Sequence, residues 1–144
     1  MVYQLIYLSY IVDGLDALKL TDEVLETARK RNPDLDITGV LIYRNEFFVQ
    51  LLEGDKEKVL SLFGKIASDP RHYNLSVLAR QEVSERLFSD WSMGFKDLSK
   101  FDHESVNKLL ELNALQERCR KGELLTNIQI LDMFKKFRYE KLAS

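Results

Sequence analysis

Residues 37–52, with the sequence ITGVLIYRNEFFVQLL, decide the fold of this chain. Two nearly continuous apolar runs, 37–43 and 46–52, are separated only by Arg44 and Asn45. β-Branched and aromatic residues dominate both runs, which is typical of strands, and so short a link favours an antiparallel hairpin. Because both faces of each run are apolar, we expect the hairpin to occupy the middle of a sheet.

One strand and one helix are predicted before this hairpin. Residues 2–9 are rich in β-branched and aromatic side chains with no breaker, which indicates a strand. Residues 22–31 carry apolar side chains at helical spacing, and Thr21 is placed to cap them. The helix is expected to end at Asn32-Pro33, because a residue that precedes proline is pushed out of the helical region.

A second helix and two further strands are predicted after the hairpin. Residues 55–68 repeat apolar side chains at helical spacing behind an Asp55 N-cap. Residues 75–83 are typical of a strand, and residues 86–95 are interpreted as another strand on a less regular pattern. The order β-α-β-β-α-β-β is the split βαβ, ferredoxin-like plan with one added strand. We therefore expect an α+β domain with two helices on one face of its sheet.

A helical extension is predicted to follow this domain. We place the domain at residues 1–97 and the extension at 98–144, with helices at 103–112 and 127–141. The last helix has a broad apolar surface that is not stable alone in water. It is expected to pack on the sheet or to form an interface with another subunit or a partner.

Composition narrows the class of protein. The 144 residues amount to about one domain. A net charge of −2, from 21 Lys+Arg and 23 Asp+Glu, argues against a nucleic-acid binder. The lone Cys119 excludes an internal disulfide framework. No signal peptide or membrane-spanning run is visible, so we expect a cytoplasmic protein without a membrane role.

Catalytic signatures are missing from the sequence, so we do not expect an enzyme. The six glycines are too scattered for a phosphate loop or a dinucleotide fingerprint. One cysteine and two histidines are too few for the common zinc sites. Glu53 and Asp55 lie close together at a strand end, where a turn followed by a helix cap is the expected structure.

Gln50 and Tyr7 are the polar residues that most need explaining. Both lie in strands that are otherwise apolar, and a buried polar group without partners costs a few kcal/mol. In the ferredoxin-like plan their strands are neighbours, so a hydrogen bond between them would satisfy both. Gln50 is either a core glutamine or, with Phe48 and Leu52 on the same face, part of a pocket for a polar ring.

Three further features leave two interpretations open. Asn32 is either a turn former or an amide for a heterocycle. Trp91 and Met93 are expected on one side of a strand. They are either core residues or the position at which the strand rearranges. A polar cluster at the end of the second helix is either solvated or holds a phosphate; it contains Lys65, Asp69, Arg71 and His72.

In order and spacing, these motifs closely resemble the BLUF family, whose name stands for blue light sensing using flavin. The resemblance covers residues 1–97 and implies a flavin, FAD or FMN, between the two helices. The extension is similar to that of the short, single-domain members, which have no attached enzyme. The motifs are Leu5-Ile6-Tyr7, Asn32-Pro33, Ile37-Thr38-Gly39-Val40-Leu41, Phe48-Val49-Gln50-Leu51-Leu52-Glu53-Gly54, Asp69-Pro70-Arg71-His72 and Phe88-Ser89-Asp90-Trp91-Ser92-Met93.

The resemblance implies a photochemical mechanism. Tyr7 would exchange an electron and a proton with the flavin under blue light, and Gln50 would rearrange its hydrogen bonds. A reversible, red-shifted state would then pass through Trp91 and Met93 to a downstream signalling protein, and a homo-oligomer is expected. The implied flavin-binding residues are Tyr7, Val24, Leu25, Ala28, Arg31, Asn32, Phe48, Gln50, Leu52, Lys65, Ile66, Asp69, Arg71 and His72.

Three positions depart from the family pattern. Leu8 stands where members often carry a small or polar residue. Ala28 replaces a residue that often makes a polar contact, and Arg31 stands where members often carry Asn or His. These departures concern the fine hydrogen bonding and not Tyr7, Gln50 and Asn32. The alternatives are a ferredoxin-like interaction module without photochemistry, with or without flavin, and a small enzyme on the same fold.

Overall fold

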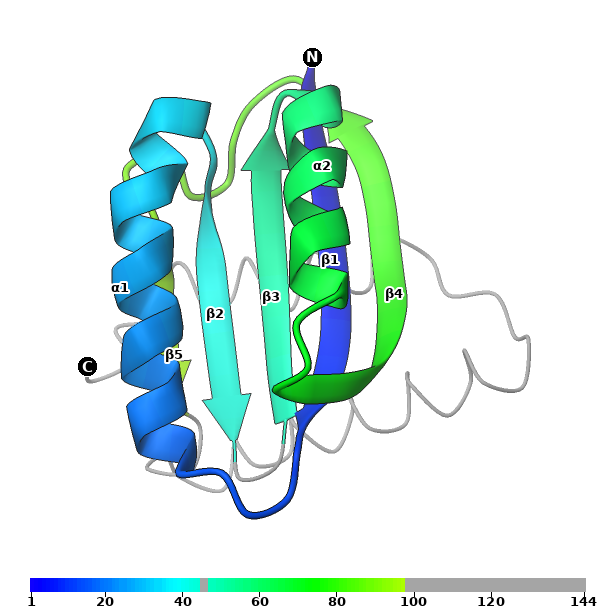
Figure 1. Cartoon of the computed structure of the whole chain (residues 1–144). Helices are drawn as coiled ribbons and strands as arrows, with labels where there is room; N and C mark the ends of the chain where they lie inside the picture. The colour runs from blue at the N-terminus through cyan, green and yellow to red at the C-terminus, as the bar shows by residue number, and fades with distance from the viewer. Residues whose placement is uncertain (45–46, 98–144) are drawn as a thin grey trace, which may run out of the picture.

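The computed structural model describes residues 1–44 and 47–97, which form a mixed sheet with two helices on one face (Figure 1). The predicted element order is confirmed. The elements are β1 (Val2–Ile11), α1 (Ala17–Leu35), β2 (Thr38–Arg44), β3 (Phe47–Gly54), α2 (Lys56–Ala67), β4 (His72–Val83) and β5 (Gly94–Asp97).

The strand order is β4-β1-β3-β2-β5, which is the ferredoxin-like order with β5 added at one edge. β2 and β3 form the predicted antiparallel hairpin. β1 and β3 are antiparallel neighbours near the centre, and β5 pairs with β2 in parallel. The apolar hairpin and first strand therefore lie inside the sheet, as their composition predicts.

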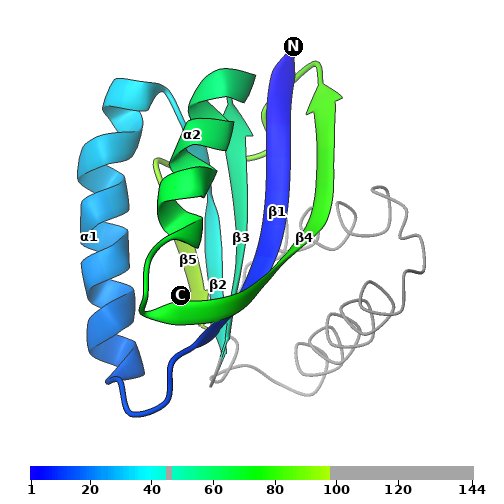
Figure 2. The same cartoon turned by 45° about the vertical axis from the view of Figure 1, so that its right-hand side comes forward.

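Two hydrophobic cores lie on opposite faces of the sheet. On the helix face, Leu5 and Leu52 pack with Leu25 of α1 and Val59 of α2. On the other face, alternate residues of the same strands form a second core that includes Phe88, which has 0% exposure. Figure 2 shows α1 and α2 side by side on a single face. Strand alternation thus divides the buried apolar residues of β1 and β3 between the two cores.

The first helix is longer than predicted at both ends. It starts at Ala17 behind an Asp16 N-cap, and the hydroxyl of Thr21 bonds to the Ala17 carbonyl within the helix, so Thr21 is not the cap. Pro33 does not end the helix either. The final turn is completed because Asp36 adopts a left-handed conformation, with φ of 52°, and its N–H bonds to helix carbonyls.

The prediction of a strand over 86–95 was wrong for most of its length. Only Gly94–Asp97 pairs with the sheet, and residues 84–93 form an irregular connection. Its backbone groups bond elsewhere: Leu87 N and Phe88 N donate to the Glu53 carboxylate, and Gly39 N donates to the Trp91 carbonyl. Side-chain acceptors therefore replace the ladder partners that a strand would have used.

The remaining predictions differ by few residues. α2 has the expected Asp55 N-cap, and β4 begins three residues earlier than predicted. The predicted helices over 103–112 and 127–141 lie outside the described residues, as does the extension 98–144. Within the described ranges, no helix is long and apolar enough to cross a membrane.

Candidate functional site

Tyr7 and Gln50 face each other across the β1–β3 pair. They are register partners, and the Tyr7 hydroxyl donates a 2.5 Å hydrogen bond to Oε1 of Gln50. Both side chains are buried, with exposures of 3% and 2%. The predicted pairing of these two residues is confirmed.

The amide of Gln50 has hydrogen-bonding capacity left over. Its Nε2 donates to the sulfur of Met93 at 3.3 Å, and a thioether is a weak acceptor. An amide nitrogen carries two N–H groups, and the second has no acceptor among the described residues. A buried donor in this state indicates room for an acceptor from a ligand.

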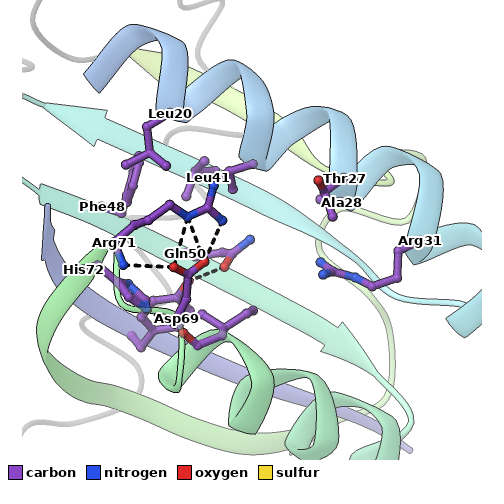
Figure 3. A pocket seen from close by; sticks show the side chains of 13 residues that line it. Leu20, Thr27, Ala28, Arg31, Leu41, Phe48, Gln50, Asp69, Arg71 and His72 are labelled. Carbon is purple, nitrogen blue, oxygen red and sulfur yellow. Dashed lines mark hydrogen bonds and ion pairs between the residues drawn. The ribbon is translucent and has the colours of Figure 1, made fainter. Parts of the chain in front are cut away.

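A cavity opens beside this pair, between the two helices (Figure 3). One face of α1, with residues at i, i+4, i+7 and i+11 from Leu20, forms one wall. Three lining residues were not predicted: Leu20, Thr27 and Leu41. Ten predicted residues line it: Tyr7, Val24, Ala28, Arg31, Phe48, Gln50, Ile66, Asp69, Arg71 and His72.

The sequence indicated a place on the cavity wall for only some of the three residues that were not predicted. Leu20 lies before the predicted start of the helix, so its place on the cavity wall depended on the longer α1. Thr27 lies one position before Ala28 on the same helix. Leu41 is the register partner of Gln50 on β2, which alternation and the hairpin register would have indicated.

Four residues that the resemblance implies as flavin contacts do not line this cavity. Leu25 and Leu52 are packed in the helix-face core. Asn32 is fully buried and turns its amide to the Ser92 carbonyl at 2.7 Å. Lys65 lines a neighbouring cavity with Arg31.

The outer end of the cavity is charged. Arg71 donates to both carboxylate oxygens of Asp69, with its Nη2 at 2.6 Å, and its Nη1 lies 3.5 Å from Glu23. These hydrogen bonds hold the pKa of Asp69 below its ordinary value and raise the pKa of Arg71. The loose contact with Glu23 leaves Nη1 of Arg71 able to donate to an anion.

His72 fastens the same end of the cavity. Its Nε2 lies 2.6 Å from the Ile66 carbonyl at the end of α2, and its Nδ1 lies 2.8 Å from Ser9 Oγ on β1. A carbonyl only accepts, so Nε2 carries a proton. Both ring nitrogens are thereby used within the protein, and His72 holds α2 against β1 and β4.

The electrostatic surroundings of Tyr7 keep it protonated. Burial raises the pKa of Tyr7 well above its ordinary value, the Arg31 cation opposes this shift and the Asp69 anion adds to it. Burial also lowers the pKa of Arg31, which Tyr7 partly offsets. Figure 3 shows the Arg31 side chain extending from α1 toward the cavity.

The ends of the connection beside the cavity differ in burial. Met93 is 2% exposed and in contact with Gln50, while Trp91 is only half-buried and packs its ring on Phe88 at 5.0 Å between centroids. The prediction that Trp91 and Met93 lie on one side of a single strand was wrong. They lie in the irregular connection, with Met93 in the helix-face core and Trp91 against the opposite core.

Glu53 is a second correction. A turn was expected there, but its carboxylate has 0% exposure and lies inside β3. It accepts hydrogen bonds from Gln4, Thr38 and two backbone N–H groups. The sequence offered one signal that Glu53 belongs to the strand: it directly follows the apolar run 46–52, with no turn residue between them. The expected N-cap role of Asp55 is confirmed.

The residues of the cavity fit a flavin. Apolar side chains on α1, β3 and α2 suit a flat aromatic ring, and Gln50 and Arg31 offer N–H donors to the ring's polar atoms. Arg71, at the charged end of the cavity, could hold a phosphate. No group of three His, Cys, Asp or Glu side chains that could hold a metal occurs within residues 1–44 and 47–97.

Comparison with known proteins agrees with this chemistry. The family model BLUF, described as sensors of blue light using FAD, matches residues 2–94. The blue light- and temperature-regulated antirepressor BluF of Escherichia coli is 36% identical over 106 residues, which are 74% of this chain and 26% of the relative. A photoactivated adenylate cyclase subunit beta of Euglena longa is 37% identical over 90 residues, 62% of this chain and 10% of the relative. The chain thus spans about a quarter and a tenth of these two relatives.

Solved structures match as well. The photo-activated state of BlsA has a TM-score of 0.81 and 28% identity, and the match covers 100% of this chain and 99% of BlsA. A bacterial light-regulated adenylyl cyclase has a TM-score of 0.74 and 31% identity, but the match covers 85% of this chain and 36% of the cyclase. The similarity to the cyclases is therefore confined to a part of each that has the size of this chain.

Proposed function

The chain belongs to the BLUF family, sensors of blue light using FAD, and we propose that it is a blue-light photoreceptor whose light-responsive pair is Tyr7 and Gln50. The single observation that carries this proposal is the buried hydrogen bond from the Tyr7 hydroxyl to Gln50 at the wall of the cavity. A tyrosine alone would only fill the core. A tyrosine whose hydroxyl donates a hydrogen bond to an amide beside a ligand cavity can give up its proton and take it back.

A bound flavin supplies the absorption of blue light and accepts an electron. Tyr7 holds its proton until it loses an electron, because burial disfavours its anion. The proton would then leave through Oε1 of Gln50, which accepts the hydrogen bond from the Tyr7 hydroxyl, and would follow the electron toward the cavity. Gln50 has a donor and an acceptor at opposite corners of one planar group, so its rotation or tautomerisation reverses its hydrogen bonds. Return of the electron and the proton would restore Tyr7, and thermal reversal of the Gln50 amide would restore the starting arrangement.

The cofactor is a flavin, and we propose FAD, with FMN as the alternative. The apolar wall from Val24, Ala28, Phe48 and Ile66 would enclose the ring, and Asn32, Leu25 and Leu52 would support it from behind. Arg31 and Gln50 would meet its polar edge, while Asp69, Arg71, His72 and Lys65 would meet the tail. Release of the cofactor by denaturation, followed by chromatography against FAD and FMN standards, decides between them.

The output is proposed to be a protein–protein contact in the cytoplasm and not an enzymatic reaction. The similarity to BlsA, which covers 100% of this chain and 99% of BlsA, supports a sensor function for these residues and not a catalytic one. The apolar pattern of residues 127–141 supports an interface with a downstream protein or a second copy of the chain. Light scattering on a chain truncated after residue 122 tests this, and an unchanged mass and unchanged partner binding would contradict it.

The photoreceptor proposal itself is tested by the purified protein. It should be yellow, with a flavin spectrum that shifts slightly to the red under blue light and returns in the dark. A colourless protein, or a flavin spectrum that never shifts, would favour an interaction module without photochemistry.

A further inference from the structure

Glu53 is a buried carboxylate surrounded by hydrogen-bond donors. Its Oε1 accepts from Gln4 Nε2 at 3.0 Å, and its Oε2 accepts from Thr38 Oγ1 at 3.1 Å. Gln4 and Thr38 lie opposite it on β1 and β2. Among the described residues, no Lys or Arg forms an ion pair with it. Hydrogen bonds alone therefore satisfy this buried carboxyl group, whose burial is costly unless its oxygens are hydrogen-bonded.

The groups held by Glu53 belong to the connection between β4 and β5. Oε1 also accepts the backbone N–H of Leu87 at 2.8 Å, and Oε2 accepts that of Phe88 at 2.6 Å. The Phe88 carbonyl then accepts from Trp91 N at 3.0 Å, which closes a turn. One side chain of β3 thus fixes the start of the segment 87–93 by two consecutive amides.

The other end of this segment is fixed by α1. Asn32 Nδ2 donates to the Ser92 carbonyl at 2.7 Å, and Arg29 Nε donates to the Met93 carbonyl at 3.1 Å. Arg29 is exposed and does not line the cavity beside Tyr7. Of the two bonds from α1, the bond of Arg29 therefore lies apart from the proposed flavin site.

The segment also touches the light-responsive pair. Met93 receives the N–H of Gln50 on its sulfur, and Trp91 lies with its ring against Gly94, where a Cβ would approach a ring atom to 2.2 Å. Gln50 and Glu53 are three residues apart on β3, or about 10 Å, and face opposite sides of the sheet. β3 is thus joined to the segment twice, through Met93 on one face and through Leu87 and Phe88 on the other.

We propose that Glu53 and Arg29 are positioning residues that fix the two ends of the segment 87–93. A change at Gln50 then displaces Met93, and the displacement reaches Trp91. The inference rests on the photoreceptor function proposed above. Because Glu53 fixes the start of the segment and Arg29 fixes its end, the backbone between them cannot accommodate a displacement of Met93 without moving Trp91. Without either residue, Gln50 still rearranges, but Trp91 no longer follows.

Two substitutions release the segment without touching the flavin site. Glu53→Gln keeps size and shape but replaces one acceptor oxygen by an NH₂ group, which faces donors and loses two of the four bonds. Arg29→Gln removes the bond to the Met93 carbonyl at an exposed helix position, where glutamine is a good helix former. If Glu53→Gln fails to fold, Arg29→Gln alone carries the test. The matched controls are the exposed residues Glu85→Gln and Lys30→Gln.

Trp91 is the single tryptophan of the chain, so tryptophan fluorescence of the flavin-loaded, full-length protein reports on it alone. We expect both variants to keep the red shift of the flavin spectrum and to lose at least half of the light-induced change in Trp91 fluorescence. The control variants should match the unchanged protein in both readouts.

Each other outcome has a distinct meaning. If the unchanged protein shows no red shift, the photoreceptor proposal fails first. If it shifts but its Trp91 fluorescence does not respond to light, or if Glu53→Gln and Arg29→Gln respond as the unchanged protein does, the positioning role is refuted. Loss of the red shift together with the Trp91 response in both variants also refutes it, because these residues would then act on the flavin site itself.

Discussion

The hydroxyl of Tyr7 donates a 2.5 Å hydrogen bond to Oε1 of Gln50, its register partner on the neighbouring strand. The two residues are 43 positions apart in the chain and meet because β1 and β3 lie side by side near the centre of the sheet. The bond leaves one N–H of the Gln50 amide without an acceptor in the described part of the chain, and it faces a cavity between two helices. Fold and chemistry are therefore linked at this one contact.

Filling the cavity from α1 should expel the flavin. Ala28 is 1% exposed and lines the cavity, so Ala28→Leu places three more carbons where the ring would lie. Overpacking typically costs about 1–3 kcal/mol, so we expect flavin affinity to fall by about tenfold or more. The ratio of flavin to protein absorbance after purification measures this. Ala67→Leu, at an exposed position on α2, is the control, and equal flavin content in both variants would be contrary to the proposed site.

The raised pKa of Tyr7 makes stability depend on alkaline pH. Below about pH 10 folded and unfolded chains both hold the proton, so the contribution of Tyr7 is constant. Above about pH 10 the unfolded chain releases it first, and the free energy of unfolding falls by up to about 1.4 kcal/mol per pH unit. Urea denaturation from pH 8 to 11 should therefore show a steeper decline for the unchanged protein than for Tyr7→Phe.

The comparison isolates Tyr7 because Tyr43, whose pKa burial also raises, is present in both proteins. Tyr73→Phe removes an exposed hydroxyl and serves as the matched control. Parallel slopes for Tyr7→Phe and the unchanged protein would contradict the buried, protonated state of Tyr7.

Asn32 should matter for stability as well as for the cofactor. Its side chain has 0% exposure and donates to the Ser92 carbonyl at 2.7 Å. Asn32→Ala leaves that acceptor without its partner, which costs about 1–3 kcal/mol in free energy of unfolding. Thermal unfolding of the flavin-free protein measures the loss, with the exposed Asp34→Ala as control. A change within about 0.5 kcal/mol would show that the bond contributes nothing.

Arg71 should discriminate between flavins that have a phosphate and those that lack one. Its side chain is 41% exposed and its Nη1 is only loosely engaged by Glu23, so the guanidinium can also meet a phosphate. We expect Arg71→Gln to weaken FMN by about tenfold and to leave riboflavin, which has no phosphate, nearly unchanged. Titration of each flavin into the flavin-free protein gives both affinities, with Lys30→Gln as control. Equal weakening of both flavins would place the phosphate elsewhere.

Much of this site could be predicted from the sequence because it depends on strand pairing. Two largely apolar strands that carry Tyr7 and Gln50 at their middles predict a buried pair once the ferredoxin-like order is recognised. Helical spacing placed Val24, Ala28 and Ile66 on the apolar faces of the two helices, and the resemblance to the BLUF family implied their place in the site. Period and order are properties of local sequence, and the structure preserves them.

The parts that sequence did not predict depend on side chains that replace backbone partners. The connection that carries Trp91 and Met93 resembles a strand in composition, but Glu53 takes two of its amides. Asp36, in a left-handed conformation, completes α1 beyond Pro33. Neither the donors around a carboxylate nor the conformation of a cap is visible in apolar periodicity.

The central claim is that Tyr7 and Gln50 together form the light-responsive pair. Its most direct test is light-minus-dark absorption spectroscopy of the flavin-loaded Tyr7→Phe and Gln50→Leu variants, beside the unchanged protein. Both substitutions keep the bulk of an apolar wall, so both variants should retain flavin. The account predicts that the unchanged protein shows the reversible red shift and that each variant loses it. A normal red shift in Tyr7→Phe or in Gln50→Leu would contradict it.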